Sequence, residues 1–189
     1  MENYHPTIWR TCRVLANARR IACLKAVLKC PGRCVGEVAK VARVGESQAS
    51  LALRALQARG LIVARRESRW VRYFPETDPL VPAAAPIVAG FRQAVLHDGA
   101  SAKKVLRCLT AFTHPRRLVL LRCLQKQGPL SFEALSKKSR ISLPALYRHL
   151  KKLESRQLVF QQEEAWALCA EHEPLATAFL NLIAGEQEP

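Results

Sequence analysis

Apolar residues recur at helical spacing along the first part of the chain. Ile21, Leu24 and Leu28 are three or four residues apart within residues 18–29, and such positions lie on one side of an α-helix. Residues 7–15 form a second amphipathic stretch. The pattern therefore predicts two helices, each with one face turned towards a core.

Two more helices and a β-hairpin are predicted next. A short helix covers residues 35–42, and a longer one begins at a cap, Ser47, and ends near residue 59. A Ser hydroxyl caps a helix by accepting a hydrogen bond from an unpaired backbone amide in the first turn, and Gly60 closes the helix. The hairpin is predicted from strands at residues 61–63 and 70–74, joined by a turn at residues 66–69.

The chain repeats itself 97 residues further on. Matched pairs include Arg19 with Arg116, Arg20 with Arg117, Leu24 with Leu121, Arg43 with Arg140, Leu53 with Leu150 and Leu56 with Leu153. Trp70 matches Trp166 if the second copy has lost one residue in between. Because the apolar positions keep their register throughout, two copies of one fold are predicted.

The second copy predicts the same elements. They are helices at residues 115–126, 131–139 and 143–156, the last capped by Ser142, strands at 158–160 and 165–168, and a closing helix at 173–184. Between the copies, Ile87, Phe91, Ala94 and Val95 form a helical stripe. A boundary near Asp98 and Gly99 divides the chain into domains at residues 1–97 and 98–189.

Helix, short helix, turn, helix and a two-stranded hairpin is the order of a winged helix-turn-helix domain. We therefore predict a mainly α fold with small β-hairpin wings, built from two such domains in tandem. In this fold the second helix of the pair enters the major groove of DNA, and its other face packs on the domain.

The charge of the chain agrees with a nucleic-acid partner. It has 30 Lys and Arg residues against 15 Asp and Glu residues, a net charge of +15. Such an excess favours binding to a polyanion, with DNA ahead of an anionic membrane surface. We expect no membrane span, because no apolar run reaches about 18 residues. With no signal peptide pattern and seven unpatterned cysteines, a cytoplasmic protein is predicted.

Candidate DNA-contacting residues lie on the predicted recognition helix and wing of the first copy. On the helix they are Ser47, Gln48, Ser50 and Arg54. Gln pairs bidentately with adenine and Arg with guanine. On the wing they are Arg65, Arg66, Arg69 and Arg72, which surround Trp70 and Tyr73. Four arginines against the single acid Glu67 favour contact with phosphate.

In the second copy the predicted recognition helix is basic but the predicted wing is acidic. Its recognition helix offers Tyr147, Arg148, His149, Lys151 and Lys152 as DNA contacts. Its wing reads Gln161-Gln162-Glu163-Glu164, and these two carboxylates would repel phosphate. Either this wing does not touch DNA, or the second copy binds something else.

These residues resemble the ArsR/SmtB family of small bacterial repressors. The segments that carry the resemblance are 15–20, 47–56, 59–62, 65–73, 114–118 and 147–153. MarR-like and other winged helices share the motif. The resemblance implies a repressor that forms a homodimer through its first and last helices. Many members also release DNA when a metal binds a Cys-Val-Cys motif, which here reads Cys34-Val35-Gly36.

Neither a cofactor nor a metal site is predicted. Cys30 and Cys34 could supply two ligands, with Cys12 or Cys23 approaching through the fold, but a soft metal needs three or four converging ligands. Cys23, Cys108 and Cys123 fall on apolar helix faces, where Cys behaves as a small buried hydrophobe. The chain also has no phosphate-binding glycine loop, nucleophile elbow or placed carboxylate pair, so no enzyme is predicted.

The predicted function is a sequence-specific double-stranded DNA-binding transcriptional regulator, a repressor. The alternative is a winged-helix protein-interaction module or dimerisation scaffold without specific DNA readout. Two architectures stay open. The copies can dock within one chain as a pseudo-dimer, or whole chains can form a homodimer in which one copy reads DNA and the other supplies the interface.

Overall fold

The computed structural model describes residues 7–185 of the 189 in the chain. Most of these residues are helical, and the strands among them form two small three-stranded sheets. The prediction of a mainly helical chain with small β-hairpins is therefore confirmed.

The same order of elements occurs twice. The first half contains α1 (Ile8–Leu15), α2 (Ala18–Lys29), β1 (Arg33–Cys34), α3 (Val35–Ala42), α4 (Glu46–Gln57), β2 (Val63–Glu67), β3 (Trp70–Phe74), α5 (Ala84–Arg92) and the π-helical η1 (Gln93–His97). The second half contains α6 (Ala102–Leu109), α7 (Pro115–Gln127), β4 (Leu130–Ser131), α8 (Phe132–Ser139), α9 (Leu143–Glu154), β5 (Val159–Gln162), β6 (Ala165–Leu168) and α10 (Pro174–Gly185).

Local signals explain where several helices begin and end. The Asn17 side chain accepts hydrogen bonds from the backbone amides of Arg19 and Arg20 and so caps α2. The His114 ring accepts from the Arg116 amide at the same place in α7. Helices α3 and α8 both end on an arginine in the left-handed conformation, Arg43 with φ 55° and Arg140 with φ 53°.

The predicted serine caps are corrected. Helix α4 begins at Glu46 with Gly45 as its N-cap, so Ser47 lies inside the first turn and cannot cap it. Ser142 does occupy the N-cap position of α9, but its side chain accepts no backbone hydrogen bond there. Ser131, predicted as the first residue of a helix, instead caps α8 by accepting a bond from the Ala134 amide.

The first hairpin is shifted from its predicted place. Leu61 and Ile62 are buried and precede β2 rather than forming it, because their side chains enter the core directly after the turn that follows α4 and ends at Gly60. Gly60 has φ +67°, and a Cβ on it would lie 2.9 Å from Val81. Arg66 and Glu67 belong to β2, so the turn is reduced to Ser68 and Arg69.

Each hairpin gains a third strand that the sequence pattern did not predict. The order is β1-β3-β2 in one sheet and β4-β6-β5 in the other. Arg33 pairs with Tyr73 and Leu130 pairs with Trp166. Since Arg33 and Leu130 are 97 residues apart, Trp166 takes the place of Tyr73, and the predicted match of Trp166 with Trp70 is wrong.

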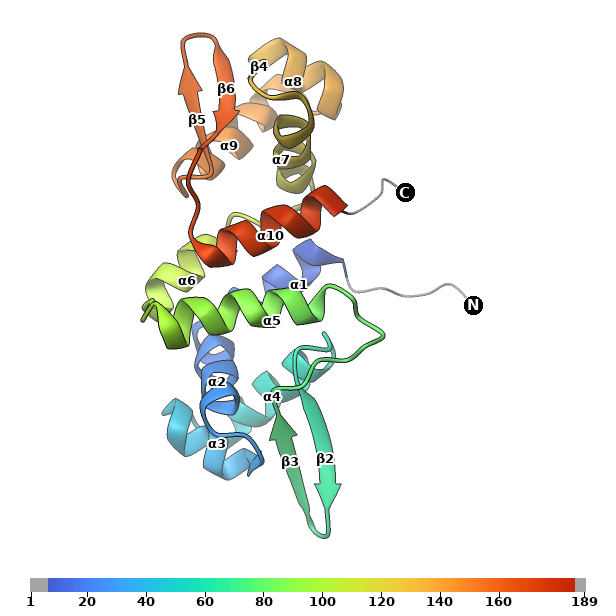
Figure 1. Cartoon of the computed structure of the whole chain (residues 1–189), viewed down its shortest axis with the longest axis vertical. Coiled ribbons are helices and arrows are strands. Elements are labelled where there is room, and N and C mark those ends of the chain that lie inside the picture. Colours follow the sequence, from blue (N-terminus) through green and yellow to red (C-terminus); the bar gives the residue numbers. More distant parts are fainter. Residues whose placement is uncertain (1–6, 186–189) are drawn as a thin grey trace.

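The two hairpins therefore differ in length. Beyond the pairs Ala64–Tyr73 and Gln161–Trp166, the first hairpin has three more pairs and the second has one. The hairpin β2–β3, called the first wing below, thus extends farther than β5–β6, called the second wing. Figure 1 shows the two wings at opposite ends of the molecule.

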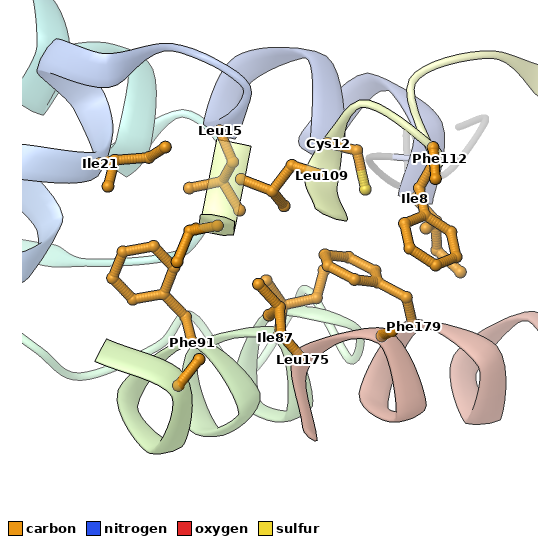
Figure 2. Packing of buried hydrophobic residues seen from close by; sticks show 14 of the residues in the cluster. Ile8, Cys12, Leu15, Ile21, Ile87, Phe91, Leu109, Phe112, Leu175 and Phe179 are labelled. Carbon is orange, nitrogen blue, oxygen red and sulfur yellow. The ribbon is translucent and has the colours of Figure 1, made fainter. Parts of the chain in front are cut away.

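A layer of helices lies between the two ends. Helix α5 packs along α10, and α1 packs against α6 and α10. Their apolar side chains point toward one another, among them Leu15, Phe91 and Leu109, all fully buried (Figure 2). Phe112 stacks on Phe179 with ring centroids 4.9 Å apart. The buried side chains of both halves form one continuous core.

Helix α6 lies in this layer although no helix is predicted for residues 102–109. Val105 and Leu109 are buried in the layer, and the Ser101 hydroxyl caps the helix by accepting a bond from the Lys104 amide. The segment before α6 turns at Gly99, which has φ +64°. The predicted division into domains near residue 98 stays a prediction.

We predict that the close packing of α5 against α10 leaves no room for a side chain at Gly90. A Cβ placed there would lie 2.8 Å from the Cβ of Ala178. Gly90→Val should lower the free energy of unfolding by about 1–3 kcal/mol, the range for overpacking a core. Denaturant unfolding measures this change. The control is Ala89→Val at the neighbouring exposed position; equal losses in the two variants would contradict the close approach.

Candidate nucleic-acid interface

Helix α4 has one buried face and one open face. Ala49, Leu53 and Leu56 are fully buried and attach the helix to the core. Ser47, Gln48, Leu51 and Arg54 are exposed on the other side. Ser50 is partly buried, and its hydroxyl accepts a hydrogen bond of 3.2 Å from the Arg54 guanidinium. The predicted contact residues of this helix thus lie on or beside its open face, and their contact with DNA stays a prediction.

Arg19 belongs to the same surface and was not among the predicted site residues. It is exposed, and with Asn17, Gln48 and Leu51 it lines a hollow beside α4. Its neighbour Arg20 is engaged inside the fold, where it donates to the Val14 carbonyl at 3.0 Å.

The second half repeats this arrangement. Arg117 is buried and donates to the carbonyls of Ala111 at 2.6 Å and Thr110 at 2.9 Å, whereas Arg116 is exposed. In each arginine pair the first residue is therefore the one available to a partner. The doublet that repeats after 97 residues was the signal that could have identified Arg19 and Arg116.

The four arginines of the first wing have different surroundings. Arg65 is ion-paired with Glu76 and lies over the Phe74 ring. Arg69 lies over the ring of Trp70, 5.3 Å from its centroid. Among the described residues neither Arg66 nor Arg69 has an acidic partner. These two cations at the end of the wing are the best placed to meet a phosphate.

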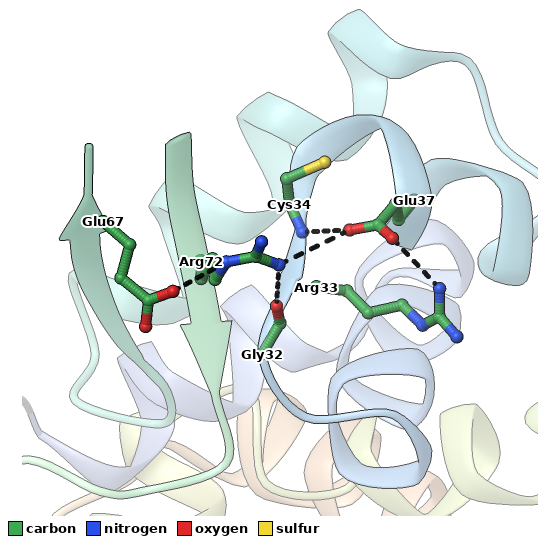
Figure 3. A network of polar contacts seen from close by, with 6 residues as sticks. All are labelled: Gly32, Arg33, Cys34, Glu37, Glu67 and Arg72. Carbon is green, nitrogen blue, oxygen red and sulfur yellow. Dashed lines mark hydrogen bonds and ion pairs between the residues drawn. The ribbon is translucent and has the colours of Figure 1, made fainter. Parts of the chain in front are cut away.

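Arg72 has a structural role in the wing (Figure 3). Its Nε lies 2.8 Å from a Glu67 carboxylate oxygen, its Nη1 donates to the Gly32 carbonyl at 2.7 Å, and its Nη1 lies 4.0 Å from Glu37. A guanidinium with these partners braces the wing against the segment before α3. Of the four predicted phosphate contacts, Arg72 is therefore the least available.

Glu37 joins the wing to the N-terminus of α3. Its carboxylate accepts a hydrogen bond from the Cys34 amide at 2.9 Å and pairs with Arg33 at 3.2 Å. The Cys34 amide, then the Cys34 thiol, hold the pKa of Glu37 below its usual value, and Arg33 and Arg72 add to this. The Cys34 that the family resemblance associated with a metal thus caps α3 beside Glu37.

The cysteines do not assemble into a cluster. Within residues 7–185 no group of three or more His, Cys, Asp or Glu side chains is placed to hold a metal ion. Burial raises the pKa of Cys23 to about 11 and, together with Glu173, that of Cys108 to about 12. Both thiols therefore stay protonated at neutral pH, which makes them poor ligands and nucleophiles.

Helix α9 presents fewer side chains to solvent than predicted. Tyr147 and Arg148 are exposed. Lys151 instead lies 2.8 Å from the Glu154 carboxylate and 5.4 Å from the centre of the Trp166 ring. Lys152 is partly buried, and this burial lowers its pKa. Two of the five predicted contacts therefore lie clearly open to a partner.

His149 faces the protein rather than solvent. Its ring centroid is 4.5 Å from that of His114, at the position that Ala52 occupies in the first half. Burial, and after it the charges of His114, Arg117, Arg116 and Arg148, together lower the pKa of His149 to about 4. At neutral pH the residue is therefore uncharged and would bring no positive charge to a phosphate, and its contact with DNA stays a prediction.

The second wing ends in Glu163 and Glu164, and both are exposed. Glu163 forms the turn with φ 51°. The first wing reaches farther and ends in cations, whereas the second is shorter and ends in anions. The acidic second wing is thus present as the sequence indicated, and its part in binding stays a prediction.

We predict that His149 makes the protein less stable in acid. Its pKa is lowered from 6.5 to about 4, so the unfolded chain takes up this proton more readily than the folded one. The stability from neutral His149 is complete above about pH 6.5 and is lost as the pH falls towards 4. Denaturant midpoints at pH 7 and pH 4.5 should differ less in His149→Ala than in the wild type.

The control for this experiment is His97→Ala, which removes an exposed histidine at the end of η1. That variant should keep the pH dependence of the wild type. An undiminished difference between the two midpoints in His149→Ala would show that this imidazole is not held neutral by its surroundings.

Comparison with known proteins gives a match in the second half. A model of the MarR family matches residues 114–163, which run from the N-cap of α7 to the turn of the second wing. None of the curated proteins compared with the chain matches it. One similar solved structure is human N-acetylserotonin methyltransferase in complex with SAM, at 13% identity and a TM-score of 0.34.

The prediction that the chain is not an enzyme is contradicted by this structural match, because the similar protein is a methyltransferase. That exclusion is withdrawn. The match covers 79% of this chain and 39% of the methyltransferase, so the chain spans well under half the length of that enzyme, and no activity is assigned from it.

The MarR match supports a winged-helix regulator, although it does not support the ArsR/SmtB family in particular. Both families share the order of helices and hairpin that carried the resemblance. No helix within residues 7–185 is long and apolar enough to cross a bilayer. Residues 114–163 thus match a winged helix-turn-helix segment typical of DNA-binding transcriptional regulators.

Proposed function

We propose that this protein is a sequence-specific double-stranded DNA-binding transcriptional regulator that inserts α4 and α9 into the major groove. The observation that carries the proposal is a repeated surface. Each half holds a twelve-residue helix with a buried apolar face and an open face. A hairpin follows this helix, and an exposed arginine lies at the start of α2 in the first half and of α7 in the second. A helix presented in this way fits the major groove.

The charge distribution supports a phosphate partner. The net charge is +15. Exposed arginines lie on α2, α7, α9 and the first wing, namely Arg19, Arg116, Arg148, Arg66 and Arg69. Cations of this kind position a protein on the DNA backbone, whereas side chains on the open helix faces read bases. The MarR match at residues 114–163 supports the same class of function.

We further propose that the regulation is repression. A protein that occupies DNA with two helices and a wing blocks access to the same sequence. The MarR match supports a regulator, and the resemblance to bacterial repressors favours repression.

We also propose that a single chain carries both DNA-binding surfaces, with two winged-helix halves in tandem. The first and last helices of each half, α1, α5, α6 and α10, are buried against one another. These are the helices through which a dimer of the resembled family would associate. Its two recognition helices would then reach half-sites about one turn of DNA apart.

The solution molar mass tests this architecture. Because the association surface is already covered, we expect a mass of 21.1 kDa for the free protein, measured by light scattering after size-exclusion chromatography. The mass should not change over a hundredfold range of protein concentration. A stable species of twice this mass would favour the homodimer of whole chains.

The first wing is tested by removing its two unpaired cations. Arg66→Ala with Arg69→Ala should weaken binding to every DNA sequence, because phosphate contacts carry no sequence information. The slope of log affinity against log salt concentration should fall by about 1 for each phosphate that the variant no longer neutralises. Fluorescence anisotropy titrations at several salt concentrations measure both quantities.

The matched control is Arg92→Ala with Lys103→Ala, which removes two cations from α5 and α6. It should have a smaller effect on binding. Equal effects in the two double variants would remove the first wing from the mechanism. The alternative, a protein-interaction module, predicts that the wild type binds DNA without sequence preference, which competition with random DNA reveals.

A further inference from the structure

The open faces of α4 and α9 carry different chemistry at the same position. Both helices have twelve residues and begin 97 residues apart, at Glu46 and Leu143. Leu51 is therefore the sixth residue of α4, and Arg148 is the sixth residue of α9. Leu51 is 63% exposed, and Arg148 is exposed as well. An apolar side chain in one half thus replaces a cation in the other.

Exposed apolar side chains concentrate on this surface. Large apolar residues that stay exposed among the described residues are Val41, Leu51, Trp70, Val71, Leu80, Leu143, Tyr147 and Phe160. Six of these eight lie on α4, α9 or the wings. Exposed apolar residues that are scattered singly need no explanation, but Leu51 differs because it lies among side chains that could contact DNA.

Leu51 stands between the groups that would contact DNA. It lines one hollow together with Arg19 and Gln48, and a second one with Ser47 and Arg54. Gln48 is one helical turn before Leu51, so both side chains lie on the same side of α4. Gln pairs bidentately with adenine, and an apolar side chain contacts the methyl group of thymine. Together they suit a half-site rich in A·T pairs.

Arg148 is the exposed cation on the corresponding part of α9. His149 is turned towards His114, and Lys151 is engaged by Glu154. Arg148 has no acidic partner among the residues that the structure describes. A free guanidinium pairs bidentately with O6 and N7 of guanine, which is the commonest specific contact in the major groove.

We propose that Leu51 and Arg148 make the two halves read different bases at the same position of their half-sites, thymine for α4 and guanine for α9. The preferred DNA is then not a palindrome, and the protein binds it in one orientation. This inference rests on the proposed DNA-binding function and adds which bases distinguish the half-sites. Discrimination of about 1–3 kcal/mol for a bidentate pair corresponds to roughly 5- to 150-fold in affinity.

Selection of bound sequences from a random pool of double-stranded DNA tests the proposal. The wild type should select a site with unlike half-sites, one with thymine and one with guanine at the position in question. Leu51→Arg should change that thymine to guanine and make the half-sites more alike. Arg148→Leu should lose the guanine of the other half-site. Both positions are exposed, so both variants should fold.

The matched control is Leu80→Arg, which makes the same chemical change at an exposed site that is 78% accessible and lies outside α4, α9 and the wings. Its selected motif should equal that of the wild type. A palindromic wild-type motif, or a motif that Leu51→Arg leaves unchanged, overturns this inference alone. A wild type that selects no motif overturns the proposed function and this inference with it.

Discussion

The apolar layer between the two halves is the contact on which the rest of the structure depends. Leu15, Phe91 and Leu109 are fully buried in it, and Phe112 stacks on Phe179. Burial of each such side chain contributes about 1.5–3 kcal/mol, so the layer holds α1, α5, α6 and α10 together as one core. Because α2 and α7 pack against this core, the layer also sets the separation and orientation of α4 and α9.

The two halves are attached to this layer in different ways. In the second half, Arg122 donates to the Ile183 carbonyl at 3.1 Å and Gln125 to the Leu180 carbonyl at 3.0 Å, so α7 holds the end of α10. The corresponding positions of the first half are Lys25 and Leu28, which do not offer the same pair of donors. In the first half, the close contact at Gly90 holds α5 against α10 instead.

The two wings also differ in their polar groups. Arg72 is tied to Glu67 and Gly32, and this brace supports a hairpin long enough to carry Arg66 and Arg69 away from the core. The second wing has Ala165 and Ala167 on its returning strand and no arginine to brace it. The second wing is thus shorter than the first, and it ends in two carboxylates rather than in cations. One half is thus built to extend cations, and the other is not.

Local residue patterns alone predicted the helices well. Residues 18–29 and 35–42 form α2 and α3 as expected, because their apolar spacing and the groups that end them are local signals. The alternation of the wing likewise predicted β3 at residues 70–74. The shift of 97 residues located equivalent positions such as Arg43 and Arg140, which share a left-handed backbone.

Contacts between distant segments decided the rest. Strand β1 forms only because β3 lies beside it some forty residues later in the chain, and the pairing of Trp166 with Leu130 overrode its apparent match with Trp70. The partners of Arg72 and the ring facing His149 also come from other elements. Charge and residue type were visible in the sequence, but which charges stay free depends on neighbours that only the folded core brings together.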